Sequence, residues 1–260
     1  MSDFINYACK DSIGIVTINR PEKRNAMTGV MIVHFLDTIR DAGESGEAHV
    51  LIITGSGGSF CAGVDLKEVA QVSNGDAGLP ERVEDRDRWW PAVECQIPVI
   101  AAVDGLAVGM GAEITCQCDI RLVTPTAKIA WNFASRGLVP DSGAGTWLLP
   151  RLIGVQKALK LMYTGDYLCA QEAFACGYVD RIVDASELLP EAIDLAKSIC
   201  RSSLFSTRKI KRLVYDGLEL ERDDHIRHSK AALEACFQSN DHREGIAAFL
   251  EKRQAKFTGT

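Results

Sequence analysis

The chain has 260 residues and a formal net charge of -6, with 25% charged and 47% hydrophobic residues. This is the composition of a globular protein that is long enough to bury a substantial core. The acidic balance argues against a nucleic-acid partner, and no apolar run approaches the ~20 residues that a membrane span requires. Residues 1–11 contain neither a basic start nor an apolar signal core, so we expect a cytoplasmic protein.

Nine cysteines are spread along the chain, and no two of them form a Cys-x-x-Cys pair. An odd number without compact spacing does not fit a disulfide framework. We interpret most of these thiols as small buried residues in a reducing compartment. Cys116 and Cys118 stand two positions apart in a predicted helix, where their side chains point in different directions. We therefore expect no metal site.

The first part of the chain alternates between strand and helix. Residues 13–19 predict a strand, and residues 20–27, with a proline and several charges, predict a loop. Thr28 suits the N-cap of an amphipathic helix that runs to about Arg40. Residues 50–54 form a second buried strand, so this order predicts parallel pairing with a right-handed crossover.

A small-residue turn at residues 60–69 leads into a second predicted helix. Gly63 allows a close approach of the backbone, and the N–H of Val64 is the natural donor at this turn. The same residues also fit an ordinary helix start with Asp65 as N-cap.

The next segment, residues 73–82, is polar, with two glycines and a proline. It predicts a mobile loop of the kind that often covers a ligand. Trp89 and Trp90 follow. Large aromatic side chains are usually buried, so we favour core positions for both over a place in a pocket wall.

The central stretch, residues 103–119, follows a β-branched apolar run. Met110 lies between two glycines that open a predicted helix, where free N–H groups and the helix dipole attract an oxyanion. Glu113 lies three residues further on the same helix face, close to any anion bound there. An acid/base group beside an oxyanion site is a catalytic arrangement. Glycine packing and an acidic first helix turn explain the same residues equally well.

The remainder predicts short strands at 120–123 and 127–131, then a third glycine-rich turn at 137–146 with Asp141 at its mouth. This turn opens a helix that carries Trp147, Leu148 and Leu149. Asp141 is either a functional group or a structural N-cap. A strand is predicted at 179–183, and helices are predicted at 154–163, 170–176, 187–200, 206–215 and 218–237. The last third is therefore a helical annex on an α/β core.

Three small-residue turns between strand and helix can converge on one edge of a sheet. The stretches at 19–27, 60–67 and 97–113 together resemble the crotonase family, the enoyl-CoA hydratases and isomerases, and residues 138–141 and 149–154 extend the match. The resemblance covers nearly the whole chain. It implies an α/β fold, with a spiral of ββα units and the acyl-CoA site in residues 1–200. Residues 201–260 would then be a helical region that covers the site and mediates the contacts of a homotrimer or a dimer of trimers.

The resemblance also implies an acyl-CoA thioester substrate, whose carbonyl oxygen binds the backbone N–H groups of Val64 and Met110 in an oxyanion hole. Glu113 falls on the leading general acid/base. Coenzyme A is part of the substrate, so no separate cofactor is implied. The substrate and CoA positions carried over are Arg24, Ala26, Ala62, Gly63, Asp65, Leu66, Lys67, Gly109 and Phe133. Arg24 and Lys67 suit phosphate, although both also fit solvated surface charges.

The sequence departs from the pattern of the family's hydratases, which hold one water between two glutamates. The position of the second glutamate is Phe133, which can neither hold that water nor exchange a proton. Asp141 sits where some members that move double bonds carry a catalytic aspartate, although the turn after it is one residue longer. Three functions stay open: hydration with Glu113 as acid/base, double-bond isomerisation with Asp141, and a weakly catalytic acyl-CoA-binding scaffold.

Overall fold

The computed structural model describes residues 4–73 and 90–260. Trp89 and most of the loop predicted at residues 73–82 lie outside these ranges. Within them, no helix combines the length and the apolar character that a membrane crossing demands.

Six strands form the main sheet. Their order across the sheet is β1 (Ile5–Lys10), β2 (Ile13–Ile18), β3 (Val50–Gly55), β4 (Val99–Val103), β6 (Ile120–Val123) and β9 (Arg181–Ile182). β1 pairs antiparallel with β2, and the other pairs are parallel. β2 and β3 are joined through α1 (Gly29–Glu44), and their pairing confirms the predicted parallel arrangement. β1 was not predicted because the middle of this edge strand is exposed and shows no buried alternation.

A smaller sheet of β5 (Leu106–Val108), β7 (Lys128–Ala130) and β8 (Leu168–Cys169) forms a second layer. Isolated bridges extend this layer, because Cys61 pairs with Ala107 and Val64 pairs with Met27. The chain therefore passes from the main sheet to the second layer and then into a helix, and it repeats this path. This is the predicted spiral of ββα units.

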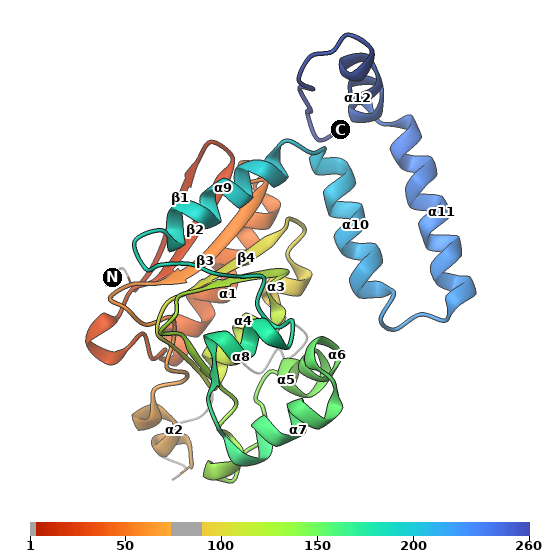
Figure 1. Cartoon of the computed structure of the whole chain (residues 1–260). Helices are drawn as coiled ribbons and strands as arrows, with labels where there is room; N and C mark the ends of the chain where they lie inside the picture. The colour runs from red at the N-terminus through yellow and green to blue at the C-terminus, as the bar shows by residue number, and fades with distance from the viewer. Residues whose placement is uncertain (1–3, 74–89) are drawn as a thin grey trace.

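Helices cover both faces of the main sheet (Figure 1). Side chains alternate along β3, so that Ile52 packs with α9 (Leu188–Cys200), whereas Leu51 and Ile53 pack in the cluster that contains α1. Burial on both faces explains the unbroken apolar run of this strand. α1 begins after Thr28, whose Oγ1 accepts the Met31 N–H at 3.3 Å, which confirms the predicted N-cap.

The remaining helices of the core are α2 (Leu66–Ser73), α3 (Pro91–Glu94), α4 (Met110–Gln117), α5 (Ala144–Trp147), α6 (Leu149–Ile153), α7 (Val155–Thr164) and α8 (Ala170–Ala175). The single helix predicted through Trp147, Leu148 and Leu149 is wrong, since α5 ends before Leu148 and α6 begins after it. Pro150 supplies no N–H to the preceding turn, and this ends the first helix.

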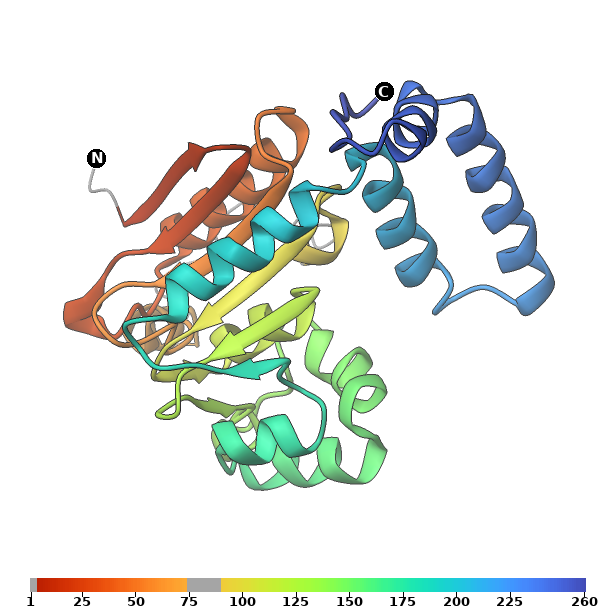
Figure 2. The same ribbon diagram turned by 45° about the horizontal axis from the view of Figure 1, so that its top comes forward.

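The C-terminal arm consists of α10 (Leu204–Asp216), α11 (Arg222–Gln238) and α12 (Asn240–Leu250), and it projects away from the sheets in both ribbon views (Figure 2). Buried Lys211 anchors it: Nζ donates to the carbonyls of Ala92 at 2.7 Å and Ile97 at 3.0 Å and pairs with Asp119 at 3.0 Å. The Tyr215 hydroxyl donates to the same Asp119 carboxylate at 2.8 Å. α10 and α11 match the predicted helices with shifted ends, and α12 was not predicted.

Candidate active site

The turn before α4 leaves a backbone donor free. Met110 is the first residue of the helix, so its N–H has no intrahelical partner. Gly109 has a φ of +56°, a conformation that favours glycine. At Gly111, an added Cβ would lie 2.2 Å from the carbonyl oxygen of Cys61, so only glycine allows the helix start to approach the 60–64 segment this closely.

The second turn brings Val64 to the same place. In the parallel bridge to Met27, the Met27 N–H donates to Gly63 and the Asp65 N–H donates to Met27, each at 2.8 Å. The N–H of Val64 therefore points to the other side of this segment. A Cβ on Gly63 would lie 3.6 Å from the Met110 nitrogen, so the two turns are in contact. Neither the Val64 N–H nor the Met110 N–H donates a hydrogen bond to a residue within the described ranges.

The loop before α1 lies against the 60–64 segment. The Ala62 N–H donates to the carbonyl of Arg24 at 3.0 Å. Buried Asn25 fixes the loop, because its Nδ2 donates to the carbonyls of Ser56 at 2.9 Å and Ser59 at 2.6 Å. Asn25 could not be recognised from the sequence, since a polar residue among charged loop residues is expected to be exposed.

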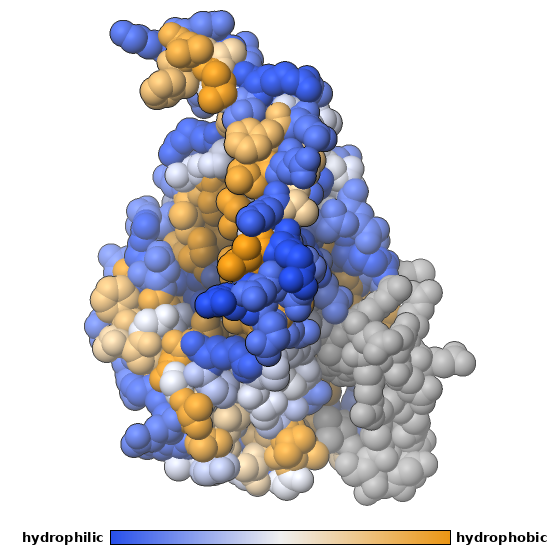
Figure 3. Space-filling model, turned by 90° about the vertical axis from the view of Figure 1, so that its right-hand side faces the viewer, coloured by the Kyte–Doolittle hydropathy of each residue, from blue (hydrophilic) through white to orange (hydrophobic). Residues whose placement is uncertain are grey.

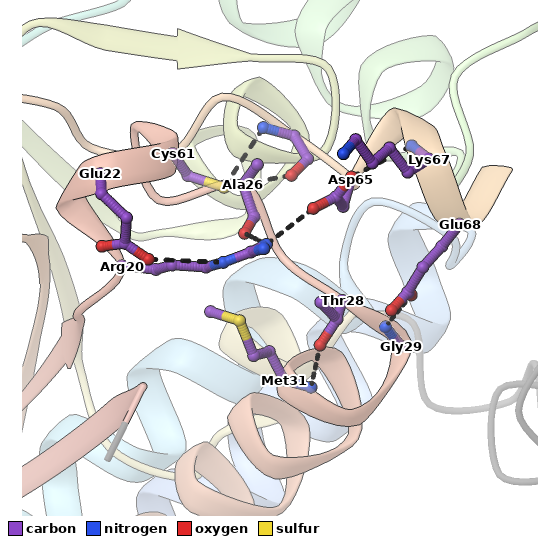
Figure 4. A network of polar contacts seen from close by, with 11 residues as sticks. Arg20, Glu22, Ala26, Thr28, Gly29, Met31, Cys61, Asp65, Lys67 and Glu68 are labelled. Carbon is purple, nitrogen blue, oxygen red and sulfur yellow. Dashed lines mark hydrogen bonds and ion pairs between the residues drawn. The ribbon is translucent and has the colours of Figure 1, made fainter. Parts of the chain in front are cut away.

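Arg20 joins the two loops (Figure 4). Its Nη1 donates to the Ala26 carbonyl at 3.0 Å and to the Asp65 carboxylate at 2.8 Å. The other carboxylate oxygen of Asp65 accepts the Lys67 N–H at 3.0 Å, so Asp65 is the residue that caps α2. These two bonds hold the pKa of the Asp65 carboxyl below its usual range. The Asp65 side chain therefore holds the two loops together and caps α2.

Three of the predicted CoA positions lie at the surface of these loops. Arg24, Leu66 and Lys67 are exposed, while Ala26 and Ala62 are half-buried between them. The hydrogen bond from Ala62 to Arg24 and the two bonds of Arg20 bring the loops that carry this predicted set together.

Glu113 is fully buried on α4, and its carboxylate contacts the start of α5. Ser142 Oγ donates to Oε2 at 2.6 Å, whereas Oε1 accepts no well-aligned hydrogen bond from the described residues. A Cβ on Gly145 would lie 2.2 Å from Oε1, so glycine is needed where α5 meets this carboxylate. Burial raises the pKa of Glu113 to about 7, against the hydrogen bond from Ser142, which lowers it.

Asp141 lies beside this pair. Its Oδ1 accepts the Ser142 N–H at 2.9 Å, and its charge also raises the pKa of Glu113. Solvent reaches the Asp141 side chain, but the surrounding protein partly desolvates the carboxyl and raises its pKa to about 6. Of the two roles left open for Asp141, that of a helix N-cap is wrong, because Gly143 is the N-cap residue of α5.

Aromatic side chains line the same region. Phe133 is buried, and its Cζ lies 3.8 Å from the place of a Cβ on Gly109, so the ring stands next to the turn before α4. Trp90 is half-buried against the core, as expected, and its Nε1 also donates to the Ser142 carbonyl at 2.8 Å. Ser142 could not be recognised from the sequence, because it is one of several small residues in a glycine-rich turn and has no motif of its own.

Comparison with known proteins gives the relationships of the chain. The sequence profile of the enoyl-CoA hydratase/isomerase family matches residues 8–260. Crotonyl-CoA hydratase of Syntrophomonas wolfei is 35% identical over 253 residues, covering 95% of each chain, and 1,2-epoxyphenylacetyl-CoA isomerase of Escherichia coli is 31% identical over 264 residues, covering 100% of both. The crystal structure of enoyl-CoA hydratase EchA1 from Mycobacterium marinum superposes with a TM-score of 0.91 at 32% identity, covering 100% of both chains. The chain therefore belongs to the enoyl-CoA hydratase/isomerase family of the crotonase superfamily and is a hydratase or isomerase of that family.

Proposed function

We propose that this enzyme moves the double bond of an enoyl-CoA thioester, with Glu113 and Asp141 as the groups that transfer the proton. The observation that carries this proposal is the pairing of Glu113 with Ser142 next to Asp141, while Phe133 occupies the position of a second glutamate. Moving a double bond requires carboxylates that take a proton from one carbon and return one to another. It requires no water held between two glutamates.

The reaction consists of two proton transfers. A carboxylate removes a proton from the α or γ carbon, and the electron pair moves toward the thioester oxygen to give a dienolate. The N–H groups of Val64 and Met110, free and adjacent, are the proposed donors that stabilise this oxygen. Reprotonation at the other end of the dienolate completes the shift. A pKa of about 7 suits Glu113 to both accepting and donating a proton near neutral pH.

The two loops joined by Arg20 are the proposed cradle for the CoA part of the substrate. Arg24 and Lys67 bring exposed cations to its edge, where they suit phosphate groups. Ala62 and Asp65 stand on either side of the turn that contains Gly63 and Val64, and their backbone N–H groups bind Arg24 and Met27 of the first loop. No group of three metal-ligating side chains occurs among the described residues, and each proposed step uses only side chains and backbone groups of this chain.

Hydration is the second candidate. It is favoured by the retained Glu113 and by relatives such as the crotonyl-CoA hydratase. In this alternative, Glu113 transfers the proton and Asp141 positions the attacking water. A purely binding scaffold is disfavoured, because two neighbouring carboxyls, Glu113 and Asp141, both have raised pKa values, a pattern that is typical of functional sites.

Asp141→Asn separates the two candidates. We expect it to lower double-bond migration in a 3-enoyl-CoA by about 100-fold, the scale of a lost acid/base group, and to leave hydration of crotonyl-CoA within a few-fold of wild type. Both rates are measured on the same purified protein. Asp194→Asn, at an exposed site on α9, is the matched control and should change neither rate. Equal losses in both assays, or no loss in either, would contradict the assignment.

We further propose that the C-terminal arm assembles the chain into a homotrimer or a dimer of trimers through its exposed apolar side chains. Large apolar side chains of the arm face solvent in the single chain: Ile210, Val214, Leu218, Ile226, Leu233, Phe237, Ile246, Phe249 and Leu250. Figure 3 shows apolar side chains gathered on this side of the molecule. α11 has no buried residue at all, and exposed apolar faces of this kind mark interfaces.

The oligomer proposal predicts a mass of three or six chains in sedimentation velocity. Leu233→Asp places a charge in the exposed apolar face of α11, and we expect it to shift the protein toward monomers at micromolar concentration because desolvating that charge is costly. Since this side chain contacts no core in the single chain, the melting of the separated subunit should be unchanged. A wild-type protein that sediments as one chain would refute the proposal.

A further inference from the structure

We propose that Ser142 is a positioning residue, whose hydroxyl orients the Glu113 carboxylate as a proton acceptor in this site, where Phe133 stands at the position of the second glutamate. The inference deepens the proposed function and rests on the role of Glu113 in it. Each polar atom of Ser142, the backbone N–H, the carbonyl oxygen and the hydroxyl, makes a hydrogen bond.

The backbone of Ser142 is held from two directions. Its N–H donates to Asp141 Oδ1 at 2.9 Å, and its carbonyl accepts the Trp90 indole N–H at 2.8 Å. Trp90 precedes α3, which is far along the chain from the turn at Ser142. The position of the Ser142 side chain is therefore set by tertiary contacts as well as by its own loop.

The direction of the hydrogen bond to Glu113 follows from the second contact of the hydroxyl. Ser142 Oγ accepts the Ala144 N–H at 3.2 Å and lies 2.6 Å from Glu113 Oε2. A hydroxyl has a single proton to give. An ionised carboxylate can only accept, so the hydroxyl gives its proton to Glu113 while a lone pair of Oγ accepts the Ala144 N–H. A donated hydrogen bond favours the charged, proton-accepting form of Glu113.

Burial and the charge of Asp141 raise the pKa of Glu113, and the hydrogen bond from Ser142 acts against both. The titratable neighbours among the described residues are Asp141, before α5, and Cys116, further along α4. Burial raises the pKa of the Cys116 thiol well above its usual range, so the thiol stays neutral. The Trp131 indole and the Gly145 backbone N–H also favour the charged form of Glu113, but Ser142 provides the largest of these favourable contributions.

The first test is the pH profile of double-bond migration. In Ser142→Ala, the acidic limb of kcat/KM should move up by about one pH unit, the effect of one lost hydrogen bond to a carboxylate. At pH 7, kcat should fall about fivefold with KM nearly unchanged, because a one-unit rise from a pKa of about 7 lowers the ionised fraction of Glu113 by that factor. Ser142→Thr, which keeps the hydroxyl, should restore the wild-type limb. Ser135→Ala is the matched control, since the Ser135 hydroxyl lies on the exposed 3-10 turn η4 (Ala134–Arg136), where it donates to the Asn132 carbonyl and accepts from Arg136 Nη1.

The second test does not depend on turnover. Acetoacetyl-CoA has an acidic α carbon, and its enolate is detected by ultraviolet absorbance, so a pH titration of the bound ligand reports proton transfer to the enzyme. The midpoint should shift by about one pH unit in Ser142→Ala. Ser142→Cys, which keeps the size but donates weakly, should shift in the same direction, and it replaces the alanine variant if that protein does not fold.

The outcomes separate this inference from the proposed function. An unchanged pH limb and an unchanged enolate midpoint in Ser142→Ala would overturn the positioning role, even if kcat and thermal stability fell through disruption of the loop. A wild-type enzyme that moves no double bond would refute the proposed function alone, because the enolate titration still measures the effect of Ser142 on the proton acceptor.

Discussion

Replacing Glu113 by glutamine should lower kcat for the enoyl-CoA substrate by at least ~100-fold, the range for loss of a general acid/base. Glutamine has the same shape and its amide oxygen can accept the Ser142 hydroxyl, so the buried surroundings of α4 stay filled. Acyl-CoA affinity should therefore remain close to that of wild type, which isothermal titration with a saturated acyl-CoA measures. Unchanged turnover in this variant would remove Glu113 from the mechanism.

The same substitution has a second readout, in stability. The folded protein raises the pKa of Glu113 to about 7, so it binds this proton more tightly than the unfolded chain does. The free energy of unfolding must then decrease as pH rises from the ordinary glutamate range to about 7. Glu113→Gln carries no such proton, and its melting temperature should exceed that of wild type more at pH 8 than at pH 5. Activity and stability change in opposite directions, which rules out simple misfolding as the cause of lost turnover.

Replacing Met110 by proline should lower kcat by about 100- to 1000-fold, the cost of removing one oxyanion donor. Met110 is the first residue of α4, a position where proline fits the helix and where the missing N–H breaks no intrahelical bond. Gly109 carries no Cβ that would meet the proline ring. The substitution therefore removes the backbone N–H of residue 110 while α4 can still form.

The controls for this variant use the same position. Met110→Leu keeps the N–H and nearly the same volume, and its turnover should stay within a few-fold of wild type. Circular dichroism and thermal melting should show that Met110→Pro retains the fold. If the leucine and proline variants lose activity equally, the side chain of Met110 matters rather than its N–H, and the oxyanion assignment fails.

Local chemistry made part of this molecule predictable from sequence. The Thr28 N-cap, the buried run of β3 and the glycines around Met110 are set by neighbouring residues, and the structure has each of them where it was expected. The two- and three-residue strands of the second layer were not predicted as a sheet, because such short segments have no periodicity and form through partners distant in sequence.

The environment of Glu113 lay beyond sequence reasoning for a related reason. The bond from Ser142 exists because α5 packs against α4 at Gly145, where any side chain would collide with the carboxylate. In the sequence, Arg20 is one of several charged residues in a predicted loop. In the structure, it holds together the loops that contain Ala26 and Asp65. Both contacts depend on the arrangement of whole elements in space.

The complete burial of α4 has a consequence for how such an enzyme changes over evolutionary time. All residues of Met110–Gln117 are buried, so most replacements there leave cavities or overpack and cost about 1–3 kcal/mol. That is a large share of the roughly 5–15 kcal/mol by which a domain is stable. Residues 134–139, which lead to Asp141, are exposed and tolerate replacement far more cheaply. We therefore expect replacements to accumulate in this outer segment, while the buried residues of α4, Glu113 among them, change little.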